Sequence, residues 1–174
     1  GYLGSDIIEN NLRSLWLIAT TLIVFGVILG LADTYGKRER TLDQLSNRHG
    51  IMYGLAQALA LMPGVSRSGA TIAMGRFLGY KREAALRYSF LLALPAVFGS
   101  GFYQLQGAIS STESNVFSLA ETAVATGIAF VVGYLVIAWL LKFVSTKSFM
   151  PFIIYRIALG MLLLILLGTG VISA

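Results

Sequence analysis

Cysteine is absent from the 174-residue sequence, proline occurs three times and histidine once. Without cysteine, neither a disulfide framework nor a thiolate metal site can form within the chain. Charged residues make up only 12%, about half of their usual share in soluble domains, whereas 56% of the residues are hydrophobic. This composition excludes an ordinary soluble domain and indicates one membrane domain over residues 1–174.

The net charge of +5 would suit a nucleic-acid-binding protein, but the distribution of the charge argues otherwise. The basic residues gather in short segments between apolar runs, which is the usual topology bias of membrane proteins. We therefore expect membrane lipid, and no nucleic acid, among the partners of this chain.

Four apolar runs are long enough to cross a hydrocarbon core, which requires about 20 residues. They cover residues 14–32, 88–105, 122–141 and 149–172. In lipid, only helices and closed barrels satisfy the backbone, and no alternating ten-residue pattern suggests a barrel. The sequence therefore predicts an all-α integral membrane protein with four transmembrane helices.

The loops between these runs predict their orientation. Segments 37–48, 81–87 and 142–147 are rich in lysine and arginine, whereas segment 106–121 contains Glu113 and Glu121 and no basic residue. By the positive-inside rule, the basic loops are cytoplasmic and segment 106–121 lies outside. Four crossings then place both ends of the chain outside.

Residues 51–80 break this pattern, because they are apolar but lie between two loops predicted on the same side. Pro63-Gly64 interrupts them, and proline ends a helix whereas glycine permits positive φ. Two helices, about 51–62 and 68–78, would each be roughly 15–18 Å long, too short to cross. We therefore predict a re-entrant helical hairpin over residues 51–80 with its turn inside the membrane.

The turn of this hairpin contains the polar side chains that could bind a ligand or act in catalysis. An arginine at membrane depth is a functional hypothesis by default, and here it stands among hydroxyls and glycines at a helix start. Such a start binds phosphate through free N–H groups and the helix dipole, with the arginine as a bidentate clamp. The candidate anion site comprises Gly64, Ser66, Arg67, Ser68, Gly69 and Thr71. The alternative is a Ser/Thr-rich helix cap, with Arg67 paired to a carboxylate.

Three motifs make the sequence recognisable, and the turn is the first of them. Segment 63–71, PGVSRSGAT, resembles the PGxSRSGAT signature of the undecaprenyl pyrophosphate phosphatase family, also called the BacA-type bacitracin-resistance family. Segment 89–95, SFLLALP, is similar to the family's SFLLAxP, and segment 151–156, PFIIYR, to its PFxxYR. The upstream segment 54–61 resembles the family as well.

This resemblance implies a hydrolase of the bacterial plasma membrane. Such enzymes remove one phosphate from undecaprenyl pyrophosphate, and so recycle the lipid carrier of peptidoglycan synthesis and confer bacitracin resistance. They depend on a divalent cation, Mg²⁺ or Ca²⁺. Their fold has two inverted repeats, each with a re-entrant hairpin, and the active site lies where the hairpin tips meet, open to the outside. The resemblance then assigns catalytic roles to Arg67 and Ser66, and substrate binding to Ser68, Thr71, Gly64 and Gly69.

One family motif has no match in this sequence. The first repeat of the family carries a Glu-rich hairpin and a histidine, whereas all eight acidic residues here lie at span ends or in loops. We therefore expect this chain to be the C-terminal part of the enzyme, inactive alone. No metal ligands are predicted within it, and the cation ligands are expected in the N-terminal repeat. A homodimer is among the expected partners.

Three polar residues outside the motif have open roles. Gln57 lies about two turns before Pro63 and is predicted to bind substrate or to hydrogen-bond to another helix. For Arg156 we favour snorkelling to the cytoplasmic interface or pairing with Asp33 over phosphate binding. His49 is expected at a surface or interface. The alternatives to a phosphatase are an anion or solute transporter with the same hairpin and a non-catalytic membrane partner.

Overall fold

The computed structural model describes residues 14–37, 39–110 and 118–172. Its elements are helices throughout this part of the chain, which confirms the all-α prediction. The α-helices are α2 (Leu15–Tyr35), α3 (Asn47–Ala58), α4 (Arg67–Phe77), α5 (Arg82–Ser110), α6 (Leu119–Thr146) and α7 (Met150–Gly168). Short 3-10 turns, Leu42–Gln44 and Leu59–Leu61, precede and follow α3.

Four of these helices are long and apolar enough to cross a membrane, as the sequence predicts. The spans are Leu15–Tyr35, Arg82–Gln106, Ala120–Thr146 and Met150–Gly168. The largest difference from the prediction is at the start of α5, which begins at Arg82 and not near residue 88. A helix can continue beyond the apolar run into a basic, solvated turn, so hydropathy alone places its start too late.

The interrupted segment forms two short helices, α3 and α4, that pack against each other. The chain before α3 and the chain after α4 lie together, because the N–H groups of Glu39 and Arg40 donate to the Gly79 carbonyl at 3.2 and 3.0 Å. Lys81 N–H donates in return to the Arg40 carbonyl at 2.9 Å. The pair therefore starts and ends at one end of the bundle, as a re-entrant hairpin requires, whereas its entry into a membrane stays a prediction.

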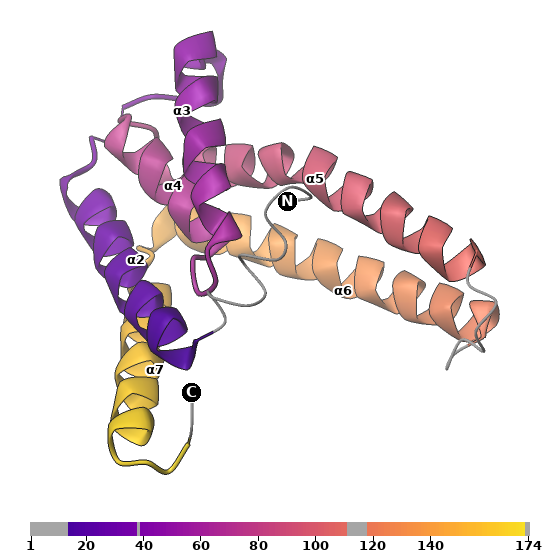
Figure 1. The fold of residues 1–174 in the computed structure, drawn as a ribbon. Helices are drawn as coiled ribbons and strands as arrows, with labels where there is room; N and C mark the ends of the chain where they lie inside the picture. Colours follow the sequence, from indigo (N-terminus) through magenta and orange to yellow (C-terminus); the bar gives the residue numbers. More distant parts are fainter. Residues whose placement is uncertain (1–13, 38, 111–117, 173–174) are drawn as a thin grey trace.

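Close packing of α2 against α7 places these two helices beside the turn (Figure 1). Gly160 on α7 makes this packing tight, since a Cβ there would lie 2.8 Å from the Ala19 carbonyl oxygen and 2.6 Å from the Ile23 side chain. Small residues let the backbones of membrane helices approach in this way. Helices α5 and α6 run side by side away from this group, and most of their side chains beyond it are exposed.

A buried ionic cluster joins the ends of four helices. Asp33 at the end of α2 accepts two hydrogen bonds from the Arg82 guanidinium, at 2.6 and 2.8 Å, and a third from Phe149 N–H at 3.3 Å. Arg76, which is fully buried on α4, lies 3.4 Å from the same carboxylate. The carboxylate thus stabilises the junction of α2, α4, α5 and α7. The predicted pairing of Asp33 with Arg156 is wrong, because Arg82 and Arg76 occupy this carboxylate.

Candidate functional site: a phosphate-binding turn

The turn between α3 and α4 can contain only glycine at position 64. Gly64 has a φ of +84°, a left-handed conformation that disfavours side chains. A Cβ at this position would also lie 2.0 Å from Thr21 Oγ1 and 2.7 Å from the Ile18 carbonyl oxygen. The turn therefore lies directly against the backbone of α2, which fixes its position relative to the bundle.

Ser66 caps the N-terminus of α4. Its Oγ accepts a hydrogen bond from Gly69 N–H at 3.1 Å and lies 3.3 Å from Ser68 Oγ. The first N–H groups of a helix have no partner within the helix, and its dipole adds partial positive charge there. The two serine hydroxyls and the start of α4 thus form the kind of terminus that binds phosphate.

Arg156 on α7 reaches this turn, which sequence reasoning did not favour. Its Nη2 donates to the Gly64 carbonyl at 3.0 Å, and a Cβ at Gly69 would lie 3.8 Å from its Nη1. Arg156 lies six residues after the start of α7, so its Cα is about 9 Å along the helix axis from the end of the bundle where α7 begins. Its position relative to the cytoplasmic interface stays a prediction, whereas its contact with the turn brings Arg156 into the candidate site.

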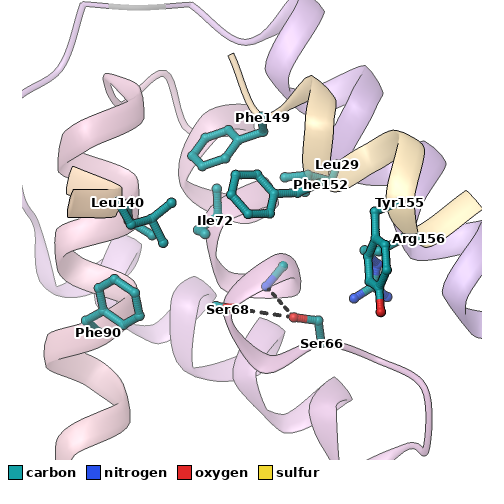
Figure 2. Close-up of a pocket in the computed structure, with 12 residues that line it drawn as sticks. Leu29, Ser66, Ser68, Ile72, Phe90, Leu140, Phe149, Phe152, Tyr155 and Arg156 are labelled. Carbon is teal, nitrogen blue, oxygen red and sulfur yellow. Dashed lines mark hydrogen bonds between the residues drawn. The ribbon is translucent and has the colours of Figure 1, made fainter. Parts of the chain in front are cut away.

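A cavity of about 270 Å³ opens beside Ser66, Ser68 and Arg156 (Figure 2). Its polar end consists of these three residues and Gly69. The rest of the wall is largely apolar and comes from five helices: Leu29, Ile72, Leu86, Phe90, Leu140, Phe149, Phe152 and Tyr155. The arrangement suits a molecule with an anionic head and an apolar body.

Arg67 and Gln57 lie on another side of the turn. They line a second cavity of about 340 Å³, together with Gly54, Ala58, Ala60, Leu61 and Ala96. The Arg67 side chain is exposed there, whereas Gln57 Oε1 is buried and has no hydrogen-bond partner. The structure therefore brings Arg67 together with Gln57, and Ser66 and Ser68 together with Arg156, in two separate cavities.

Thr71 lies away from both cavities. It is fully buried, and its Oγ1 is within hydrogen-bond distance of the Arg67 and Ser68 carbonyls and of Ser89 Oγ. Thr71 thus ties the first turn of α4 to α5, and its role in substrate binding stays a prediction. Ser89, the first residue of the SFLLALP segment, therefore has a structural role as the partner of Thr71. The sequence alone did not predict this role.

The described residues do not form a divalent-cation site. No group of three or more His, Asp or Glu side chains meets anywhere in residues 14–37, 39–110 and 118–172. Asp33, the buried carboxylate of this part, is already bound by two arginines. The donor set near the turn consists of hydroxyls, an amide and guanidinium groups, which suits an anion and not a hard cation.

His49 is remote from both cavities and has a structural environment. Its Nδ1 lies 2.8 Å from the Tyr80 hydroxyl, which itself donates to the Gln44 carbonyl at 3.2 Å. Its Nε2 lies 3.2 Å from Arg40 Nη1. Burial raises the pKa of Tyr80, so the hydroxyl keeps its proton at neutral pH. His49 therefore joins α3 to the loops on either side of the helix pair, as expected for an interface residue.

The chain is similar in sequence to proteins of one known family. The family model of bacitracin resistance protein BacA matches residues 1–162. A protein of Pseudarthrobacter chlorophenolicus named undecaprenyl-diphosphatase is 62% identical over all of this chain and 63% of its own length. The undecaprenyl-diphosphatase of Paenarthrobacter aurescens is 61% identical over the same shares. Undecaprenyl-diphosphatase 2 of Agrobacterium fabrum is 60% identical over all of this chain and 62% of its own length.

The chain thus spans somewhat less than two thirds of the length of these relatives. Its match to them nevertheless covers this whole chain, and so includes the turn between α3 and α4. The chain belongs to the BacA family of bacitracin resistance proteins.

Proposed function

We propose that this chain supplies the phosphate-binding half of an undecaprenyl-diphosphatase. The observation that carries the proposal is the start of α4, where Ser66 and Ser68 adjoin Arg156 in one cavity and Arg67 adjoins Gln57 in another. Relatives that match the whole chain bear the name undecaprenyl-diphosphatase. The substrate is accordingly a polyprenyl diphosphate, and the products are a polyprenyl monophosphate and inorganic phosphate.

The reaction is the hydrolysis of a phosphoanhydride. The oxygen of a nucleophile bonds to the terminal phosphorus, the bond from that phosphorus to the bridging oxygen breaks, and the bridging oxygen leaves with the lipid monophosphate. A water molecule contributes the hydroxyl and the proton of the products. Guanidinium groups neutralise charge on the phosphate oxygens in such a transfer. The N–H groups and hydroxyls at the helix start donate hydrogen bonds that hold these oxygens in place.

The base and the divalent cation lie outside this chain in our proposal. The described residues offer hydroxyls, Gln57 and two guanidinium groups at the site, and no free carboxylate. Mg²⁺ or Ca²⁺ requires carboxylate oxygens, so its ligands must come from the remainder of the protein. This chain then binds and orients the diphosphate, and is inactive without that remainder.

The membrane context is part of the same proposal. The α3–α4 pair enters the bacterial inner membrane from the cytoplasm, and the turn faces a cavity open to the outside. Two observations support this orientation: the helix pair starts and ends at the same end of the bundle, and the loops at that end are basic. We also propose a homodimer, which would cover part of the exposed apolar surface of α5 and α6.

The test is phosphate release from a polyprenyl diphosphate by the purified protein as the cell makes it. Replacement of Arg67 by Ala should reduce release at least about a hundredfold, since one cation on the transferred group is lost. Arg48→Ala, which removes an exposed arginine at the start of α3, is the matched control and should remain near wild type. Near-normal turnover of the Arg67 variant would contradict the proposal.

A transporter of anions or solutes is the second candidate, favoured by the broken helix pair. Liposomes that take up phosphate without any release of phosphate from lipid diphosphates would support it. A protein that shows neither activity would point to a non-catalytic membrane partner.

A further inference from the structure

We propose that the cavity beside Ser66, Ser68 and Arg156 holds the first isoprene unit of the substrate together with the phosphate attached to it. The terminal phosphate, which is cleaved, then faces Arg67 and Gln57 on the other side of the turn. This inference rests on the proposed function and assigns each arginine to a different phosphate of the same substrate.

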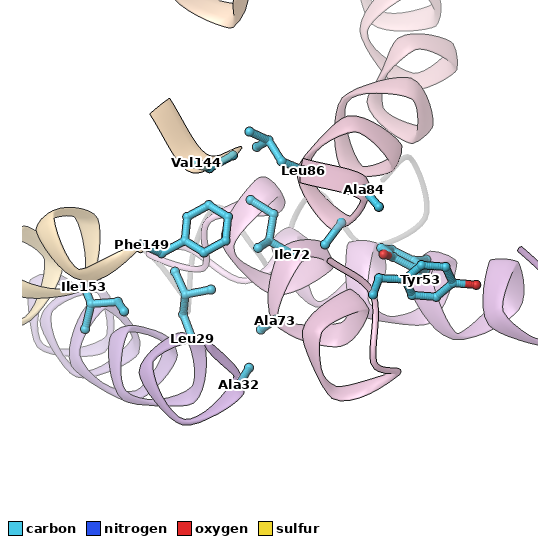
Figure 3. Close-up of a cluster of buried hydrophobic side chains, with 12 residues drawn as sticks. Leu29, Ala32, Tyr53, Ile72, Ala73, Ala84, Leu86, Val144, Phe149 and Ile153 are labelled. Carbon is cyan, nitrogen blue, oxygen red and sulfur yellow. The ribbon is translucent and has the colours of Figure 1, made fainter. Parts of the chain in front are cut away.

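The walls of the cavity favour a hydrocarbon chain. Leu29, Ile72, Leu86 and Phe149 belong to the buried core at the junction of the helices (Figure 3), so this side of the cavity is preformed. Phe90 and Leu140 close the opposite side. An apolar cavity of about 150 Å³ accepts benzene with its six carbons. By that proportion, the cavity of about 270 Å³ accepts about ten non-hydrogen atoms, which corresponds to one phosphate group and about one isoprene unit.

The polar end of the cavity suits one phosphate. Arg156 is half-buried there, and its Nη2 is engaged by the Gly64 carbonyl, whereas its Nε is buried and makes no hydrogen bond. Ser66 and Ser68 supply two hydroxyls beside it. A phosphate that bridges Arg156 and the serines would leave its ester oxygen directed to the apolar walls, where the prenyl chain begins.

Arg67 has surroundings of the opposite kind. Its cavity is lined by Gln57 and mostly by small side chains, and no aromatic residue lines it. A group without an apolar body fits this position, and the terminal phosphate is such a group. The two cavities therefore divide the diphosphate at its bridging oxygen, which is the atom that leaves with the lipid.

The first experiment fills the apolar cavity. Leu140→Trp should raise the KM for undecaprenyl diphosphate about tenfold or more, the effect of displacing about two methylene groups from an apolar site, with a smaller change in kcat. The control is Leu135→Trp on the same helix, where the side chain is 60% exposed and lines no part of the cavity; its KM should match wild type. An unchanged KM in the Leu140 variant overturns the inference. A lower melting temperature without a KM change also overturns it, because the cavity then serves packing with the rest of the protein.

The second experiment separates the two arginines by product inhibition. Arg156→Lys should weaken inhibition by undecaprenyl monophosphate about tenfold and leave inhibition by inorganic phosphate unchanged, because a lysine loses the fork geometry at one phosphate only. Arg67→Lys should show the reverse pattern. Equal effects of both variants on both inhibitors overturn the inference.

These results are distinguishable from failure of the proposed function. If the wild-type protein releases no phosphate from any polyprenyl diphosphate, the proposed function is wrong. If the wild-type protein is active, but Leu140→Trp leaves the KM unchanged or the two arginine variants affect both inhibitors equally, only the division between the cavities is wrong.

Discussion

Thr21 on α2 and Pro63 in the turn are 42 positions apart and share a hydrogen bond of 2.8 Å, which the Thr21 hydroxyl donates to the Pro63 carbonyl. The next carbonyl, that of Gly64, accepts from Arg156 on α7. Helices α2 and α7 therefore hold two consecutive carbonyls of the turn from the same side. This contact fixes the orientation of the chain that leads into the start of α4, the proposed phosphate site.

Replacement of Thr21 by Val should show the importance of this bond. Valine has the shape of threonine but cannot donate to the Pro63 carbonyl, and the loss of a hydrogen bond in this partly buried position costs about 0.5–1.5 kcal/mol. We expect a lower melting temperature in detergent and a lower kcat/KM, both restored by Thr21→Ser. Thr20→Val is the control, because the Thr20 side chain is exposed and bonds only within its own helix. Equal effects at positions 20 and 21 would contradict the assignment.

Gly64→Ala should disrupt the turn more severely. Positive φ costs a side chain about 1–2 kcal/mol, and overpacking against Thr21 and Ile18 about 1–3 kcal/mol more. We expect loss of activity and a large drop in melting temperature. Gly99→Ala on α5 provides the comparison, since a Cβ there meets nothing within 4 Å. That variant should be as stable as wild type or slightly more so.

Local signals were sufficient to predict the helices and the turn. Apolar runs of about 20 residues have few alternatives in lipid, so the four spans follow from length and composition. Pro63 and Gly64 divide the apolar segment 51–80 into α3 and α4, because proline ends a helix and glycine adopts positive φ whatever their neighbours are. The second short helix, predicted from about residue 68, begins at Arg67 in the structure, with Ser66 as its N-cap.

Long-range pairings could not be predicted in the same way. Asp33 has Arg76, Arg82 and Arg156 as candidate partners, and only the packing of α2, α4 and α5 decides among them. Which side of the turn each side chain faces also depends on neighbouring helices. The motif therefore predicted Arg67 in one site with Ser66 and Ser68. In the folded chain Arg67 lines a different cavity, and Arg156 from α7 lies beside the two serines.

Asp33→Asn should test the ionic junction. Removal of the carboxylate charge breaks the bidentate pair with the partly buried Arg82, and breaking a buried pair costs about 3–5 kcal/mol. A strong decrease in melting temperature is expected, with activity lost in proportion to the unfolded fraction. The exposed Asp43, replaced by Asn, should leave the melting temperature close to wild type. A stable Asp33 variant would show that the arginines find other anions.

The orientation of the turn can be measured with single cysteines, because this chain contributes none. Any cysteine elsewhere in the protein is first replaced by serine. Positions 48, 62 and 118 are exposed in the structure. A membrane-impermeant thiol reagent added outside should label Ser118→Cys and should not label Arg48→Cys.

Met62→Cys, at the end of the first half of the helix pair, decides the re-entrant arrangement. Although the loops on both sides of the pair are predicted inside, a turn that faces an outward-open cavity should let this cysteine react from the outside. Undecaprenyl monophosphate, bound at the turn, should slow that labelling and leave the labelling of Ser118→Cys unchanged. Labelling of Met62→Cys from the cytoplasmic side alone would mean that the turn does not reach the outer cavity, and that the phosphate is released inward.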